Sequence, residues 1–198
     1  MTNSLFAVDR DGAIGARYDK VDLVPFGEFL PFRGLLGRLG MEKLTAGSVD
    51  YVRGQGRQTI RLPGLPPFSP LICYETIFAG RAYGPERPEW LLNVTIDTWF
   101  GDSIGPHQHL AMARMRAIEE GLPLIRVANS GISASIDAHG RVVERLGLDV
   151  VGVRDVALPA PVEKTLFSRN RWLLLGASVG LGLVLAVVGE WIGRRRSS

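Results

Sequence analysis

Residues Ser69-Pro-Leu-Ile-Cys-Tyr-Glu-Thr-Ile-Phe78 contain the single cysteine of a chain of 198 residues. Residues 70–72 are apolar and follow a turn rich in proline and glycine, which predicts the end of a buried strand. Cys73 lies where this strand gives way to the next element. A thiol at such a corner points into a cleft and can lie near helix N-terminal N–H groups, which favour the thiolate. The stretch therefore predicts a cysteine nucleophile, and the alternative is an inert cysteine in the core.

Apolar runs of similar length recur on both sides of this strand, separated by turn residues. They predict hairpins at residues 4–18 and 131–145, and strands at residues 58–62, 90–96, 122–128 and 150–158. Residues 107–120 have apolar side chains at helical spacing and end at Gly121, while residues 77–83 could form a second helix. Short strands that alternate with few helices are typical of a layered α/β domain rather than a helix bundle.

The charge of the chain argues against a nucleic-acid partner. The formal net charge is +3 at pH 7, from 23 Lys and Arg against 20 Asp and Glu. Arg194, Arg195 and Arg196 supply all of this excess, so the rest of the chain is balanced and has no basic footprint. A length of 198 residues allows one domain with an appendage, and a single cysteine excludes an intramolecular disulfide.

Residues 172–189 have no charged side chain and are flanked by Trp172 and Trp191. A helix of about 20 residues, at 1.5 Å per residue, matches the roughly 30 Å hydrocarbon core of a bilayer. Tryptophan is typical of both membrane interfaces. The stretch predicts a transmembrane helix at residues 169–193 and a basic tail at residues 194–198, and the alternative is a buried core helix. Basic residues flank both ends equally, so charge leaves the orientation open.

Two further segments have compositions that suggest function. Residues 29–44 carry leucine, phenylalanine, glycine and proline with interspersed basic residues. Two interpretations stay open for them: a helix packed on the core, or a mobile apolar arm that touches lipid. Residues 97–106 form a long loop with two aromatic side chains, and ordered loops of this length are often functional.

We consider two pairs of polar residues as parts of a site: a lysine with a glutamate, and two histidines. Lys20 and Glu28 lie eight residues apart in a segment that two prolines keep out of a helix. For each of them the alternative is a solvated surface charge, which is the usual environment of lysine and glutamate. His107 and His109 have no third ligand nearby in the sequence, so they do not predict a metal site.

Three segments of the chain together resemble a known family. They are Tyr18-Asp-Lys20 running into Leu23-Val-Pro-Phe-Gly-Glu-Phe-Leu-Pro31, then Ile72-Cys-Tyr-Glu75, and Asp97-Thr-Trp-Phe-Gly101 followed by Gly105-Pro-His-Gln-His-Leu-Ala-Met-Ala-Arg-Met-Arg116. The chain resembles the C-terminal part of the apolipoprotein N-acyltransferase family, a membrane-bound branch of the nitrilase (carbon–nitrogen hydrolase) superfamily. The resemblance covers most of the chain, including the apolar stretch near its end.

The resemblance implies a partial nitrilase-type αββα sandwich over residues 1–168, with its N-terminal portion missing. The superfamily uses a Glu–Lys–Cys triad, in which Cys73 matches the nucleophile and Lys20 matches the lysine. The residues at supporting or substrate-binding positions are Glu28, Tyr74, Glu75 and Trp99. The general-base glutamate of the family matches no position in this chain, so the isolated chain is expected to be inactive.

The activity that the resemblance implies is acyl transfer in lipoprotein maturation at the bacterial inner membrane, with the catalytic domain on the periplasmic side. A phospholipid would donate its acyl chain to Cys73 as a thioester. The α-amino group of the diacylglyceryl-cysteine of a lipoprotein would accept it, and a missing N-terminal half would be a partner. No metal or organic cofactor is implied. Two alternatives stay open: a membrane-anchored amidase, and an inactive fragment that packs on a partner.

Overall fold

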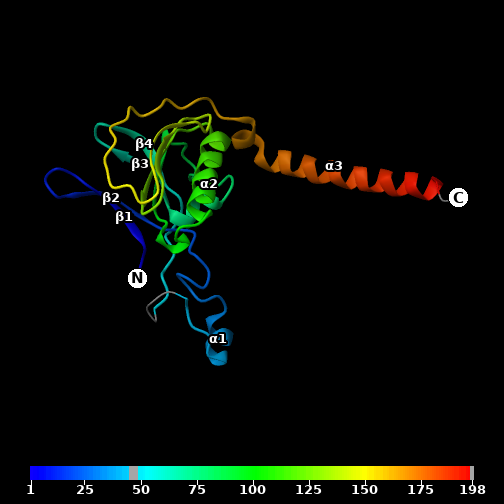
Figure 1. Ribbon diagram of the computed structural model, residues 1–198, viewed down its shortest axis with the longest axis horizontal. Helices are drawn as coiled ribbons and strands as arrows, with labels where there is room; N and C mark the ends of the chain where they lie inside the picture. Colours follow the sequence, from blue (N-terminus) through cyan, green and yellow to red (C-terminus); the bar gives the residue numbers. More distant parts are fainter. Residues whose placement is uncertain (45–48, 197–198) are drawn as a thin grey trace.

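A computed structural model describes residues 1–44 and 49–196, without the side chains of residues 174, 175 and 190–196. Within these residues a six-stranded sheet has the order β3-β4-β5-β6-β7-β8 (Figure 1). Its strands are β3 (Ile60–Leu62), β4 (Leu65–Ile72), β5 (Trp90–Ile96), β6 (Leu124–Asn129), β7 (Ser133–Ile136) and β8 (Val142–Leu146). Strands β4, β5 and β6 are parallel, and the flanking pairs are antiparallel. The carboxyl ends of β4 and β5 therefore lie at the same edge of the sheet.

One face of the sheet is covered by helix α2 (Gly105–Glu120), which connects β5 to β6 (Figure 1). The helix begins with a proline in its first turn, where a missing N–H costs nothing, and ends at Gly121 with φ 65°. Its small and apolar side chains pack on alternate residues of the strands. This buried cluster includes Leu110, Ala113, Ala117, Leu71, Leu91, Leu124 and Ile136.

The opposite face carries a hairpin of β1 (Ser4–Val8) and β2 (Ile14–Asp19), which pair antiparallel. Tyr18 belongs to β2, and its side chain is fully buried against those of Ile60, Phe68 and Ile72. The molecule thus has a helix layer, a sheet and a second β layer, so the prediction of a layered α/β domain is confirmed.

Most predicted strands are present with shifts of one or two residues, but two predicted elements are wrong. Residues 77–83 are not a helix: a 3₁₀ turn, η2 (Cys73–Ile77), is followed by an irregular loop in which Gly80 has φ 65°. Residues 150–158 are not a strand, because this segment runs past the sheet without pairing to any described strand. The four valines of this segment have high strand propensity, but propensity alone does not supply a strand to pair with.

Residues 29–44 do not form a helix packed on the core, so this interpretation is wrong. The segment contains a single helical turn, α1 (Arg33–Leu36), and a 3₁₀ turn, η1 (Gly37–Leu39), with no buried residue in either. Figure 1 shows α1 standing away from the sheet. The side chains of Phe32, Leu35, Leu39 and Leu44 are mostly exposed, which leaves the apolar arm as the interpretation that fits.

The chain ends in α3 (Leu166–Arg196), which has a non-helical residue at Asn170 and projects away from the domain (Figure 1). Among the described residues no single helix has the length and apolar composition to cross a membrane. Two helical segments, Leu166–Leu173 and Gly176–Gly189, have this length and apolar composition only when they are taken together. A bend of 50° separates them. The predicted roles of Trp191 and of the basic tail at residues 194–198 lie outside the described side chains.

The C-terminal cap of α2 yields a prediction about stability. A Cβ on Gly121 would lie 2.8 Å from the carbonyl oxygen of Glu163 and 2.9 Å from Cγ2 of Val162, whose N–H donates to the Gly121 carbonyl. Gly12 also has positive φ, but nothing lies within 4 Å of its Cβ position. We expect Gly12→Ala to lower the free energy of unfolding by about 1 kcal/mol and Gly121→Ala by roughly 2–3 kcal/mol. Chemical unfolding measures both, and equal losses would contradict a steric role for residues 162 and 163.

Candidate active site

Cys73 is the first residue after β4 and the first of the 3₁₀ turn η2. Its backbone is left-handed, with φ 50°, a conformation that costs a non-glycine residue of order 1–3 kcal/mol. The residue is only partly buried and packs at the edge of the cluster that contains Tyr18 and Ile72. A strained cysteine at the carboxyl end of a strand is consistent with the predicted nucleophile.

The buried carboxylate of Glu75 joins the cysteine turn to the segment that carries Lys20. Its Oε1 accepts hydrogen bonds from the backbone N–H groups of Val21 and Asp22, at 2.7 and 3.1 Å. Its Oε2 accepts one from the N–H of Ile72, at 2.7 Å, and the Tyr18 hydroxyl lies 2.9 Å from Oε1 and 3.0 Å from Oε2. Tyr18, which precedes Lys20, and Val21 and Asp22, which follow it, are thus all bonded to a side chain two positions from Cys73.

Two arginines complete this cluster. Arg57 lies 2.9 Å from the Glu75 carboxylate and 2.7 Å from that of Asp22, and Arg81 lies 2.9 Å from Asp22. Burial and the charge of Glu75 raise the pKa of Tyr18 well above its usual value, so the phenol remains a hydrogen-bond donor. The cluster therefore occupies both carboxylate oxygens of Glu75 as hydrogen-bond acceptors.

Lys20 is 2% exposed, so the alternative interpretation of this residue as a solvated surface charge is wrong. Its Nζ lies 2.9 and 2.8 Å from the two carboxylate oxygens of Glu28. Glu28 also accepts from the N–H of Val24 at 2.8 Å and from the side-chain amide of Asn3 at 3.0 Å. This buried pair fixes a positive charge on the segment that Glu75 holds beside the Cys73 turn.

His109, on the first turns of α2, contacts the backbone of Cys73 from the other side. Its Nε2 lies 3.2 Å from the carbonyl oxygen of Cys73 and 3.0 Å from the Thr76 hydroxyl. Its Nδ1 lies 2.9 Å from the carboxylate of Asp97. No pattern in the sequence indicates this role, because His109 stands out there only as one half of a histidine pair without a third ligand. Within the described residues no cluster of ligands suits a metal ion.

Asp97 connects this histidine to a buried arginine. Its second oxygen lies 2.5 Å from the guanidinium of Arg126, which also donates to the side-chain oxygen of Asn93. Thr95 donates to the first oxygen from 3.1 Å. Burial raises the pKa of Asp97, but the hydrogen bond from His109 and the charge of Arg126 outweigh it and hold the pKa below its usual value. Asp97 directly follows β5, so its position at the same sheet edge as Cys73 was the signal available in the sequence.

The two aromatic candidates lie nearer the surface. Tyr74 is partly buried and packs edge-on against Phe78, with 5.0 Å between ring centroids. Trp99 lies on the 3₁₀ turn η3 (Thr98–Phe100) and is 75% exposed. Its neighbour Phe100 packs edge-on against His109 at 5.8 Å. The structure thus brings Cys73 and Glu75 together with the Lys20 segment, and leaves Trp99 facing solvent.

The chain belongs to the carbon–nitrogen hydrolase family, whose model matches residues 1–165. It is 51% identical over 187 residues to the apolipoprotein N-acyltransferase of Rhodopseudomonas palustris, covering 94% of this chain. It is 42% identical over 188 residues to the apolipoprotein N-acyltransferase of Brucella melitensis, covering 90% of this chain. The chain spans 35% of the length of each of these curated relatives. The resemblance read from the three sequence segments is confirmed.

Solved structures support the same fold. A carbon–nitrogen hydrolase superfamily protein from Xanthomonas campestris superposes with a TM-score of 0.51 at 24% identity, over 73% of this chain and 52% of that chain. A variant of an amidase from Nesterenkonia sp. AN1 gives a TM-score of 0.53 at 18% identity, over 88% and 61%. The predicted nitrilase-type α/β fold is therefore confirmed.

The Asp97 network yields a prediction that depends on pH. Asp97→Asn leaves the Arg126 charge buried without its counter-charge, so the free energy of unfolding at pH 7 should fall by roughly 3 kcal/mol. Because the folded pKa of Asp97 is lowered, its stabilisation is present above about pH 4 and is lost as the pH falls through that lower value. Chemical unfolding at several pH values should show the variant and parent converging in acid.

The matched control is Asp102→Asn, which changes an exposed carboxylate of the same loop. The free energy of unfolding of this control should remain within about 0.5 kcal/mol of that of the parent at every pH. A deficit of Asp97→Asn that stays constant down to pH 2 would show that the carboxylate charge is not what stabilises the network.

Proposed function

We propose that this chain carries the catalytic cysteine of an apolipoprotein N-acyltransferase, which moves a phospholipid acyl chain to the α-amino group of a lipoprotein's diacylglyceryl-cysteine. The observation that carries the proposal is the bonding of Glu75 to the backbone of Val21 and Asp22, directly after the buried Lys20, and to the backbone of Ile72, directly before Cys73. The similarity to proteins named apolipoprotein N-acyltransferase selects this reaction among those of the family.

The first half-reaction forms a thioester. The Cys73 thiolate attacks the carbonyl carbon of the phospholipid ester, and the carbonyl oxygen takes the negative charge. Lys20 stabilises this oxyanion electrostatically, and a fixed donor of this kind is worth roughly 3–4 kcal/mol in a site that excludes water. The C–O ester bond then breaks, and the lysophospholipid alkoxide leaves with a proton from the general acid.

The second half-reaction transfers the acyl group. The neutral α-amino group of the acceptor attacks the thioester carbon, a base removes its proton, and the C–S bond breaks to regenerate the thiolate. The product is an amide, so the enzyme returns to its starting state without an external reductant or oxidant. Trp99 and Tyr74, at the surface beside the site, are our candidates for contacting the substrates.

We assign the general base to a segment outside these 198 residues. The oxygens of Glu75 are occupied by backbone amides, a phenol and a guanidinium. Those of Glu28 are occupied by Lys20, Val24 and Asn3. A carboxylate whose oxygens already accept from several donors is poorly placed to take a proton from the thiol. The full length of the relatives leaves room for the missing group.

Membrane attachment supports a lipid donor rather than a soluble amide. We propose that residues 169–193 span the bacterial inner membrane, that residues 1–168 lie on the periplasmic side, and that residues 194–198 face the cytoplasm. The uncharged stretch at residues 172–189 and the bent pair of helical segments support a span. The exposed leucines and phenylalanine of the arm at residues 29–44 would contact the same bilayer.

A membrane-anchored amidase would use the same cysteine and lysine with water as the acceptor. The exposed apolar arm favours a lipid substrate over this alternative. An inactive fragment that only packs on a partner would have no use for a strained cysteine or a buried Lys20–Glu28 pair. The two alternatives are therefore less well supported than acyl transfer.

The proposal predicts a covalent intermediate on Cys73. The chain is incubated with labelled phospholipid in the presence of the portion of the Rhodopseudomonas palustris relative that it does not match, supplied as a second polypeptide. We expect a hydroxylamine-sensitive thioester that Cys73→Ala abolishes, and no thioester when the chain is alone. Label that survives Cys73→Ala would refute the nucleophile, and turnover by the chain alone would place the base within it.

The role of Lys20 is tested in the same complemented system. Lys20→Met should lower the rate of thioester formation by ~10²-fold or more, because the oxyanion loses its stabilising charge. This variant also leaves Glu28 without its partner, so the double variant Lys20→Met/Glu28→Gln serves as the control for folding. The double variant should recover thermal stability but not rate. A near-normal rate in either variant would contradict the role of Lys20.

A further inference from the structure

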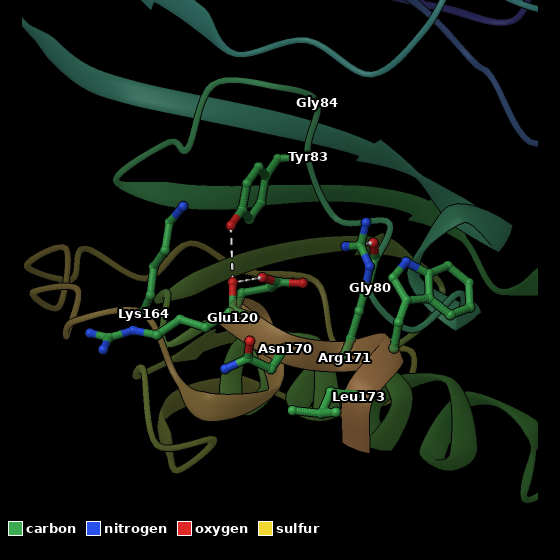
Figure 2. Close-up of a pocket in the computed structure, with 11 residues that line it drawn as sticks. Gly80, Tyr83, Gly84, Glu120, Lys164, Asn170, Arg171 and Leu173 are labelled. Carbon is green, nitrogen blue, oxygen red and sulfur yellow. Dashed lines mark hydrogen bonds between the residues drawn. The ribbon is translucent and has the colours of Figure 1, made fainter. Parts of the chain in front are cut away.

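A cavity of about 430 Å³ lies where α3 leaves the domain (Figure 2). Its walls come from the loop at residues 80–84, the end of α2 and residues 164–173. Its polar lining includes Tyr83, Glu120, Lys164, Ser168, Arg169 and Arg171. We propose that this pocket binds the phosphate headgroup of an anionic glycerophospholipid and so fixes the domain against the bilayer. The proposal rests on the membrane span proposed above but not on acyl transfer.

The pocket is separate from the cysteine site. His109, which contacts Cys73, lies near the start of α2, while Glu120 is its last residue. At 1.5 Å per residue these two positions are roughly 16 Å apart along the helix. A ligand in the pocket would therefore not occupy the place of the acyl group on Cys73.

The floor of the pocket is already ordered by hydrogen bonds. Ser168 lies 2.6 Å from the buried carboxylate of Glu120 and 3.1 Å from the Tyr83 hydroxyl, as the dashed lines in Figure 2 show. Arg171 crosses Gly80 and donates to its carbonyl oxygen. A Cβ on Gly80 would come within 2.7 Å of the Arg171 side chain, so glycine is what admits the arginine here.

The charges of the lining favour an anion. Three basic side chains and one acidic side chain surround the cavity, and the acidic one, Glu120, is held by the Ser168 hydroxyl. Among the described residues the side chain of Lys164 has no hydrogen bond or ion pair, and the side chain of Arg169 has only an exposed contact of 3.3 Å with Glu163. Lysine and arginine N–H groups donate strong, charge-assisted hydrogen bonds to phosphate oxygens.

The surroundings favour a phosphate that belongs to a lipid. Trp172 and Leu173 line the pocket and are mostly exposed, and the uncharged stretch at residues 172–189 begins at this point. An indole beside a cationic pocket is typical of the level of the headgroups. A soluble phosphate would gain nothing from these apolar side chains, whereas the acyl chains of a phospholipid would lie along them.

The experiment measures lipid retained by the 198-residue chain in the Cys73→Ala background, so that no lipid is turned over. The chain is extracted in detergent, and native mass spectrometry counts bound phosphatidylglycerol or phosphatidylcholine. We expect one phosphatidylglycerol per chain, little phosphatidylcholine, and no displacement by millimolar inorganic phosphate. Lys164→Gln/Arg169→Gln should weaken phosphatidylglycerol binding by about tenfold or more.

The matched control, Arg194→Gln/Arg195→Gln, removes the same charge from the other flank of the apolar stretch and should change binding less than about twofold. Equal weakening by both double variants would show diffuse attraction to anionic lipid and overturn the pocket. Equal retention of phosphatidylcholine, or displacement by inorganic phosphate, would also overturn it. Extraction of the chain from membranes by alkaline carbonate would instead refute the membrane span on which the pocket proposal rests. None of these measurements depends on acyl transfer, so they test the pocket separately from the proposed reaction.

Discussion

The buried carboxylate of Glu75 is the interaction on which the geometry of the site depends. Burying an isolated carboxylate is costly, and here three backbone amides, a phenol and the guanidinium of Arg57 offset that cost. Three of these donors belong to the main chain of Ile72, Val21 and Asp22, so the carboxylate fixes the course of two backbone segments at once. The direction in which Lys20 leaves its segment follows from this constraint.

A second network supports the same turn from the side of α2. There His109 and Thr76 contact the Cys73 carbonyl, and Asp97 with Arg126 anchors His109. A left-handed cysteine persists only where its surroundings over-determine the backbone. The hairpin side and the helix side each contribute one charged network, which explains why so many ionisable groups are buried around a single turn.

The strands were predictable because their apolar runs end at turn residues, and β5 has the predicted bounds of residues 90–96. The helix expected at residues 77–83 failed because Gly80 has positive φ there. At the site, Cys73 and Glu75 could be predicted from local sequence and resemblance. The pairing of His109 with Arg126 could not, because their contact arises only when α2 packs on the sheet and no local pattern records it.

The left-handed backbone of Cys73 has a consequence for how this position can vary. Glycine adopts that conformation without penalty, so folding alone would favour glycine at residue 73 over any residue with a side chain. Selection for thermal stability would therefore tend to replace the thiol, whereas the acyl transfer proposed here would require it. Under that proposal the position is a stability–activity trade-off confined to a single residue, and variants designed for stability would keep this cysteine.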